Sequence, residues 1–154
     1  MHKTLALARP TVFCAAAWIL AAASAPVAAQ EGPTRAARGD TVWVILNHVK
    51  PDQRTNFERY VFEILFPAID KLAADDSVKR QQYVQTRVLL PTRQNRDSTY
   101  TYVYLMDPLV QDVSYSYRNI LSEVYTEEEV EQYLTLVANA LARPQESYLV
   151  VQRH

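Results

Sequence analysis

The chain of 154 residues is poor in three residue types that carry much of enzyme chemistry, with one cysteine, two glycines and three histidines. Cys14 lies in a segment that we expect to be removed, so the mature chain would hold no disulfide, thiolate nucleophile or cysteine metal site. Both glycines lie within residues 30–40, which excludes the usual glycine-rich nucleotide loops, and no G-x-S-x-G or HExxH motif occurs. Any chemistry therefore depends on other side chains.

Residues 1–29 have the layout of a secretory signal peptide. Lys3 and Arg9 give a basic start, and an alanine-rich apolar run follows. Val27 and Ala29 then stand at the −3 and −1 positions before Gln30. We expect cleavage after Ala29 and export to the periplasm or the exterior. The alternative is that the run is kept as a membrane anchor, since an apolar stretch of nearly this length can span a bilayer.

Removal of the leader leaves 125 residues, enough for one compact domain. The leader holds two basic residues and no acid, so the mature chain has 14 basic and 17 acidic residues and a net charge of −3. This balance argues against nucleic acid or an anionic membrane surface as a partner. Residues 30–40 show no apolar periodicity, and we interpret them as a flexible tether before a domain over residues 41–154.

Residues 41–49, TVWVILNHV, form the most continuous β-branched and apolar run of that domain. A strand that is apolar on both faces must be covered on both faces. Pro51 suits the first turn of a helix, and the pattern predicts this helix over residues 51–72, with a kink at Pro67. Its apolar face is formed by Phe57, Val61, Ile64, Leu65, Ala68 and Leu72.

The remaining pattern predicts a hairpin, a helical region and a final strand. Thr126 and Glu129 form a capping box that begins the last helix. The expected elements are a loop over 73–78, strands over 81–90 and 99–106 joined by a polar turn over 91–98, helices over 114–125 and 127–142, and a strand over 148–152.

This order, β-α-β-β-α-β, predicts an α+β, ferredoxin-like antiparallel sheet with the helices on one face. One layer of helices leaves the other apolar face uncovered, and an exposed patch of that size indicates an interface. With Lys50-Pro51 opening the first helix and a sheet that is apolar on both faces, the chain resembles the dimeric α/β-barrel superfamily, in particular its small antibiotic-biosynthesis-type monooxygenases. The resemblance implies a homodimer whose two sheets enclose a lumen, and chemistry without a cofactor.

Side-chain alternation then predicts which residues line that lumen. We expect Val42, Val44, Leu46 and His48 to face the helices. The alternate residues of that strand should face the lumen. The row of tyrosines on the strand over residues 99–106, Tyr100, Tyr102 and Tyr104, should face the lumen as well. The predicted substrate-binding residues are Trp43, Tyr83, Gln85, Tyr100 and Tyr104. The predicted catalytic residues are Asn47, Arg87, Tyr102 and His48.

Each predicted role has a chemical reason and a structural alternative. Arg87 could stabilise an enolate or phenolate oxygen, Asn47 could hold a carbonyl, and a tyrosine could shuttle a proton. Tyrosines also pack dimer interfaces, Arg87 could be an interfacial ion-pair partner, and an isolated histidine such as His48 is often structural. No metal site or cofactor is expected, because no second histidine stands at a coordinating spacing.

The sequence therefore leaves two functions open. One is the binding or transformation of a small aromatic or carbonyl compound, in the manner of a cofactor-free monooxygenase. The other is a non-catalytic interaction domain that dimerises through its sheet.

Overall fold

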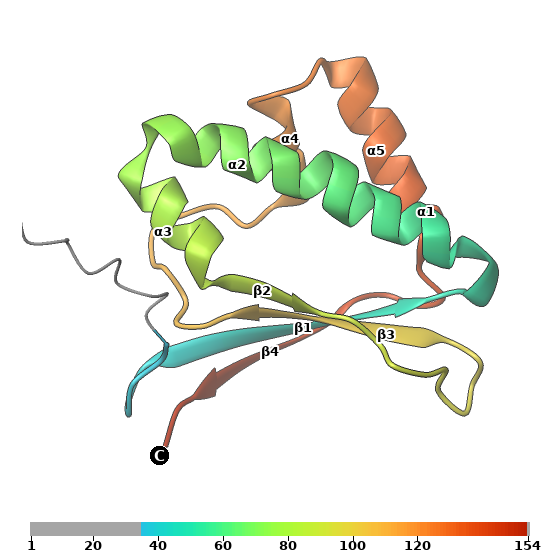
Figure 1. The fold of residues 1–154 in the computed structure, drawn as a ribbon, viewed down its shortest axis with the longest axis horizontal. Helices are drawn as coiled ribbons and strands as arrows, with labels where there is room; N and C mark the ends of the chain where they lie inside the picture. The colour runs from blue at the N-terminus through green and yellow to red at the C-terminus, as the bar shows by residue number, and fades with distance from the viewer. Residues whose placement is uncertain (1–34, 154) are drawn as a thin grey trace, which may run out of the picture. The chain divides into compact units, whose positions relative to one another are not determined.

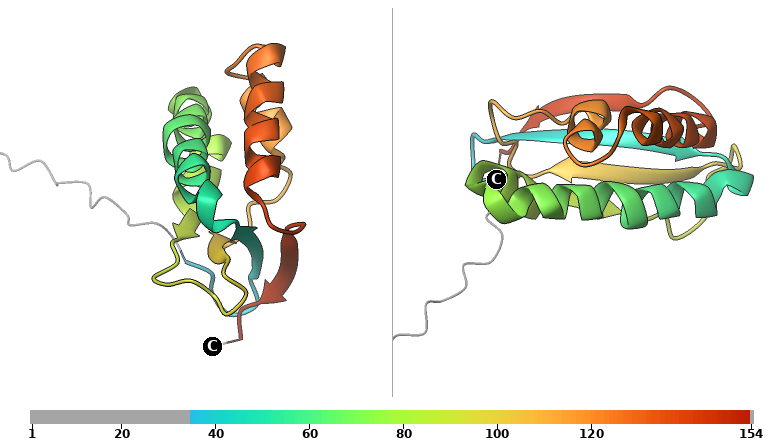
Figure 2. Two further views of the ribbon diagram at one scale, coloured as in Figure 1. Left: turned by 90° about the vertical axis from the view of Figure 1, so that its right-hand side faces the viewer. Right: turned by 90° about the horizontal axis from the view of Figure 1, so that it is seen from above.

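The computed structural model describes residues 35–153, so the predicted leader, its cleavage site and the start of the tether lie outside the described residues. The described chain forms one four-stranded antiparallel sheet with the order β2-β3-β1-β4. Its helices all lie on one side of that sheet (Figures 1 and 2). The predicted ferredoxin-like α+β order is confirmed. The strands are β1 (Thr41–Val49), β2 (Thr86–Leu89), β3 (Tyr100–Met106) and β4 (Glu146–Val151).

β1 lies in the middle of the sheet because it pairs with a strand on each side. Its residues 43–49 pair with β3, and its residues 41–46 pair with β4. A strand in this position has its main-chain groups bonded on both edges, and its β-branched side chains fit the pleated surface. The longest apolar run of the sequence after the leader is thus one of the two central strands, β1 and β3.

Residues 51–75 form a continuous helical stretch that changes pitch along its length. Pro51 stands in the first turn, as predicted. We predicted a kink at Pro67. A π-helical segment ends at Leu65, two residues before that proline, which has no N–H to give to the preceding turn. The segments are η1 (Pro51–Gln53), α1 (Arg54–Arg59), η2 (Tyr60–Leu65, π-helical) and α2 (Phe66–Asp75).

The prediction of a loop over 73–78 and of a strand beginning at residue 81 was wrong. Residues 73–75 continue α2, and a further helix, α3 (Ser77–Gln85), precedes a short β2. The reason is Asp76, whose Oδ1 accepts hydrogen bonds from the N–H groups of Val78 (2.8 Å) and Lys79 (3.1 Å). These bonds satisfy first-turn donors, so a residue that resembles a loop former begins a helix instead.

The second helical region consists of α4 (Tyr117–Ser122) and α5 (Glu127–Ala140). The predicted capping box at the start of α5 is confirmed. Glu129 Oε2 accepts from the Thr126 N–H at 2.9 Å, and Thr126 Oγ1 accepts from the Glu129 N–H at 3.4 Å. None of the helices in the described chain is both long and apolar enough to cross a membrane.

The sheet presents its faces in the opposite sense to the one predicted. Ile45, Asn47 and Val49 are buried under the helices, whereas we expected them to face away. The ring centroid of Tyr102 lies 4.8 Å from that of Phe57 in α1, so the tyrosine row of β3 also points toward the helices. Packing explains this choice, because the gap of about 10 Å between a sheet and the layer packed on it is filled best by large side chains.

The helix-free face of the sheet, called the bare face below, carries smaller apolar side chains. Strand register places Leu46 opposite Val103 and Val44 opposite Leu105 on this face. Tyr148 and Val150 of β4 and Leu89 of β2 are close to half exposed. The sheet is therefore apolar on both faces as expected, but the residues assigned to the two faces are exchanged.

The capping box makes a testable contribution to stability. Replacement of Thr126 by alanine removes the side chain that accepts from the Glu129 N–H, and we expect the free energy of unfolding to fall by about 1 kcal/mol. Urea denaturation followed by circular dichroism measures this loss. Thr135→Ala, an exposed change within α5, is the matched control, and an equal loss in both variants would contradict the role of the cap.

Candidate functional site

Polar side chains from five segments meet between the sheet and the helices. We call Asn47, Tyr60, Tyr104, Tyr117 and Gln145 the phenol–amide cluster. Asn47 and Tyr104 come from neighbouring strands, Tyr60 comes from the π-helical segment, and Gln145 precedes β4. The rings of Tyr60 and Tyr117 meet edge to face with centroids 5.7 Å apart. Residues distant in the sequence therefore form one polar group inside an apolar core.

The cluster runs from the surface to the interior. Gln145 is exposed, and its Nε2 donates to Asn47 Oδ1 and, at 3.3 Å, to the Tyr117 hydroxyl. Asn47 is fully buried, and Tyr104 is 4% exposed. The Tyr104 hydroxyl lies beside that of Tyr117 without a well-formed hydrogen bond. Polar contacts thus connect the solvent-facing amide to groups that water reaches poorly.

Three atoms of the cluster lack a hydrogen-bond partner in the described part of the chain: Asn47 Nδ2 and the hydroxyls of Tyr60 and Tyr104. Leaving a buried polar group unsatisfied costs about 1–3 kcal/mol, so such groups are uncommon in a folded interior. Three of them together indicate a place where another molecule can supply the missing bonds.

Burial keeps the phenols of the cluster protonated. Desolvation raises the pKa of Tyr60 and of Tyr104 far above the ordinary value of 10.0. Burial also raises the pKa of Tyr117 to about 12, although the bond from Gln145 acts in the opposite direction. At neutral pH these groups are hydrogen-bond donors rather than phenolate bases. They are suited to a carbonyl oxygen or to an oxygen that gains negative charge.

A cleft of about 750 Å³ leads from solvent to this cluster. It lies between the β1–β4 side of the sheet and the helices α4 and α5, and Tyr117 and Gln145 belong to both the cleft and the cluster. Trp43 and Tyr115 give it an aromatic wall, with ring centroids 5.5 Å apart in an edge-to-face arrangement. A smaller hollow of about 40 Å³ shares Ile45, Tyr115 and Tyr117 with the cleft and is also lined by Tyr104.

Three of the predicted site residues, Trp43, Asn47 and Tyr104, belong to the cleft or the cluster. Tyr100 and Tyr102 make other contacts. The Tyr102 hydroxyl donates to Glu58 Oε1 at 2.5 Å, and the guanidinium carbon of Arg54 lies 4.6 Å from the centre of the Tyr100 ring. These two tyrosines connect α1 to β3.

The three residues predicted on the second strand are divided between two elements. Tyr83 and Gln85 lie in α3, which corrects their assignment to a strand. The Tyr83 ring packs against Phe66 with centroids 6.1 Å apart, while Gln85 is buried and its Oε1 has no partner in the described chain. Arg87 lies on β2 opposite Leu105 and forms an ion pair with Asp107 on the bare face.

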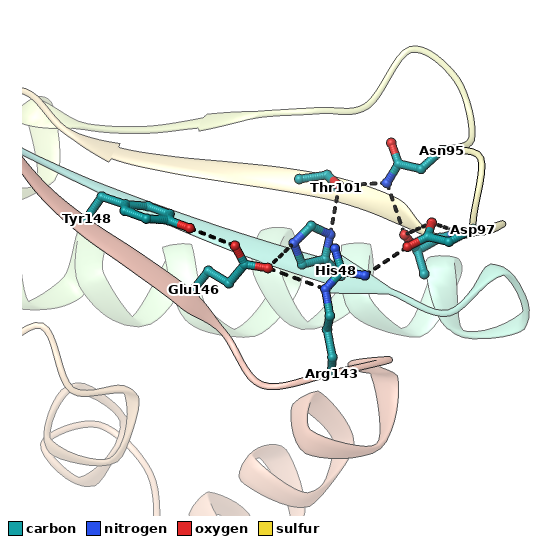
Figure 3. A network of polar contacts seen from close by, with 8 residues as sticks. His48, Asn95, Asp97, Thr101, Arg143, Glu146 and Tyr148 are labelled. Atoms are coloured by element: carbon teal, nitrogen blue, oxygen red, sulfur yellow. Dashed lines mark hydrogen bonds and ion pairs between the residues drawn. The ribbon is translucent and has the colours of Figure 1, made fainter.

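His48 also lies on the bare face, whereas we expected it to face the helices. Its Nδ1 is 3.0 Å from Thr101 Oγ1, and its Nε2 is 3.2 Å from Glu146 Oε1 (Figure 3). Glu146 also accepts from the Tyr148 hydroxyl at 2.8 Å and lies 3.4 Å from Arg143 Nε. The bond from Tyr148, followed by the nearby positive charges, lowers the pKa of Glu146. His48, which is 5% exposed, is thus part of a polar network on the bare face that joins β1, β3 and β4.

Sequence reasoning missed Tyr60, Tyr117 and Gln145. Tyr60 had a usable signal, since it is a phenol three residues after Phe57 on a predicted core face. Tyr117 and Gln145 stand in segments whose local pattern gives no indication of what they contact. No group of three or more histidine, cysteine, aspartate or glutamate side chains able to hold a metal occurs among residues 35–153.

Comparison with protein-family models finds no match for the chain, and comparison with curated proteins finds none. Among solved structures, a "putative antibiotic biosynthesis monooxygenase" from Caulobacter crescentus CB15 is similar, with a TM-score of 0.40 and 11% sequence identity. The similarity covers 76% of this chain and 92% of that one. It concerns the fold alone, and the assignment of the fold rests on the strand order and register.

The raised phenol pKa values predict a loss of stability at alkaline pH. A group whose pKa is higher in the folded state than in the unfolded state contributes stability below the unfolded pKa and loses it as the pH rises. For Tyr117 this window runs from pH 10.0 to about 12. The unfolding free energy of the wild type should decrease between pH 9 and pH 11.5, roughly the range in which this stability is lost. We expect that decrease to be smaller in Tyr117→Phe, which has no phenol to titrate at this position.

Urea denaturation at the two pH values measures this difference. Tyr83→Phe removes a phenol outside the cluster and is the matched control. An equal reduction in both variants would show that the buried position of Tyr117 has no special effect.

Proposed function

We propose that the chain binds a small aromatic compound with a ring carbonyl or hydroxyl group in the cleft that leads to the phenol–amide cluster. The observation that supports this most is that the unpartnered donor Asn47 Nδ2 belongs to a residue bonded to Gln145 of the open cleft. Tyr104, whose hydroxyl has no well-formed hydrogen bond, lines the smaller hollow beside that cleft. The rings of Trp43 and Tyr115 suit a flat ligand body. The cleft is of the size that small-molecule sites have.

The catalytic form of this proposal is oxygenation of the bound compound by dioxygen without a cofactor, as the superfamily resemblance implies. One oxygen atom would enter the compound, and the compound itself would supply the electrons that reduce the other atom to water. The cluster would stabilise an enolate or phenolate oxygen through neutral O–H and N–H donors. Tyr60, Tyr104 and Tyr117 remain protonated, so removal of the substrate proton would need a base other than these phenols. We also propose that the chain acts outside the cytoplasm, because residues 1–29 have a secretory pattern.

The bare face supports a second proposal, dimerisation through the sheet, which is compatible with ligand binding in the cleft. Apolar side chains of all four strands lie on this face, and the described chain has no helix over it. Apolar surfaces of this kind are covered by a partner in stable oligomers. We propose that a second copy of the chain covers it and that the protein is a homodimer. This interface would serve an interaction domain equally well if the cleft carried no chemistry.

Ligand binding can be measured through Trp43, which lines the cleft. Trp18→Phe in the full chain leaves Trp43 as its only tryptophan. We expect 2-hydroxy-1,4-naphthoquinone to quench its fluorescence saturably after correction for absorbance. Asn47→Leu in this background should weaken binding by about tenfold, because a buried donor is lost.

Gln85→Leu is the matched control, since Gln85 is also a buried amide with an unpartnered atom but lies in α3, outside the phenol–amide cluster. Gln85→Leu should be at least as stable as its parent, because it removes an unsatisfied polar atom. Asn47→Leu removes one as well but also loses the bond from Gln145, so circular dichroism must show that this variant is folded. Equal affinity in all three proteins, or no saturable quenching, would rule out the proposed site.

The dimer can be tested at the centre of the bare face, where Val103 lies opposite Leu46. Light scattering after gel filtration should give twice the chain mass for the wild type. Val103→Lys should give a folded monomer, because an interfacial charge without a partner is costly to bury. Val84→Lys on the exposed surface of α3 is the control and should stay dimeric. A monomeric wild type, or an unchanged mass for Val103→Lys, would contradict this interface.

A further inference from the structure

A second cavity, of about 350 Å³, lies in the helical layer and has no part in the proposed function. It is enclosed by the end of α2, by α3, by α4 and by the loop that leads from β3 to α4. Its apolar walls are formed by Ile69, Leu72, Val78, Val113 and Ile120. Among the described lining residues it shares Val113 with the cleft, and Ile69, Gln82 and Ile120 with the smaller hollow. The volume suits a small molecule with an apolar body.

The polar groups around this cavity are mainly carboxylates. The described lining contains Asp76, Asp112 and Glu123, with Lys79 as its one cation. Lys79 forms an ion pair with Glu123, and Asp76 accepts the two N–H groups at the start of α3. Asp112 is exposed and has no ion pair or side-chain hydrogen bond within residues 35–153, so no cation of the described chain neutralises its charge.

The inner part of the cavity offers a further acceptor. Gln82 is 7% exposed and lines the cavity, and its Nε2 donates to the Ser114 carbonyl oxygen at 2.9 Å. The fixed amide leaves Oε1 available to a donor on a ligand, since an amide oxygen accepts and cannot donate. Apolar walls, an uncompensated carboxylate and a buried acceptor therefore occur together.

This combination selects one class of ligand. An anion would be repelled by the carboxylates. A neutral apolar molecule would gain nothing from the Asp112 charge and would leave the Gln82 acceptor without a partner. A primary amine supplies three N–H donors and a positive charge. We propose that this cavity binds a small amine with an aromatic or branched apolar body, whose ammonium group is held by Asp112 and Gln82.

The test uses the full chain and three probes of nearly equal shape: 2-phenylethylamine, 2-phenylethanol and 3-phenylpropionate. Isothermal titration calorimetry at pH 7 should show that the amine binds at least about tenfold more tightly than the alcohol, because the ammonium brings a positive charge to Asp112 that the alcohol lacks. The carboxylate should bind most weakly. Equal affinity of the amine and the alcohol, or no heat with millimolar amine, would overturn the proposal.

Asp112→Asn keeps the shape of the side chain and removes its charge. Asp112 has a φ of 58°, which asparagine adopts readily, so the fold should be preserved. We expect the affinity for 2-phenylethylamine to fall to that for the alcohol. Asp70→Asn removes one exposed charge of α2 outside the cavity lining and should leave the affinity unchanged.

The two proposed sites can be told apart in the same assay. Asn47→Leu should bind 2-phenylethylamine as the wild type does, and 2-hydroxy-1,4-naphthoquinone should not compete with the amine. Unchanged amine affinity in Asp112→Asn, or competition between the two probes, would show that the amine does not occupy this cavity.

Discussion

The covering of β1 by helices on one side alone is the constraint on which the other features depend. β1 is bonded to β3 and β4 along its edges, so its side chains can be covered only above and below the sheet. The helices fill the space above it with large groups such as Phe57 and Tyr60, both fully buried. The gap beneath the helices is wide enough for aromatic rings. Because tyrosine rings carry hydroxyl groups, polar atoms enter the core with them and lie beside amide side chains. The cleft and the phenol–amide cluster follow from this packing.

The same packing separates two kinds of polar group. Groups on the bare face have charged neighbours: Arg87 forms an ion pair with Asp107, and His48 Nε2 lies 3.2 Å from Glu146 Oε1. Groups beneath the helices are neutral amides and phenols, and some of them have no partner in the described chain. A neutral donor can be buried at moderate cost, whereas an isolated charge cannot. The chain therefore concentrates its charges where water or a second protein can reach them, and its uncharged donors where a small molecule can.

The sequence predicts the order of elements, the proline-initiated helix and the capping box at Thr126, because each of these depends on short-range chemistry. It misassigns α3, because Asp76 caps a helix while also having the composition of a loop residue. It assigns the two faces of the sheet the wrong way round, because β1 is apolar on both sides and alternation alone gives no sign of which side is wider. Asn47 is found as a candidate residue, but Gln145, which binds it, comes from 98 positions away. Contacts across such a separation arise from the assembled fold.

The two edges of the sheet differ in how well they resist unwanted pairing. β2 is four residues long and is followed closely by Pro91, so it offers little backbone to another strand. β4 is six residues long, and its outer edge pairs with no strand in residues 35–153. Two apolar residues of this strand, Leu149 and Val151, are 67% and 54% exposed. Edge strands with these properties nucleate intermolecular β-structure. In a partly unfolded or overconcentrated sample, aggregation would therefore begin at β4, near the carboxyl end of the chain.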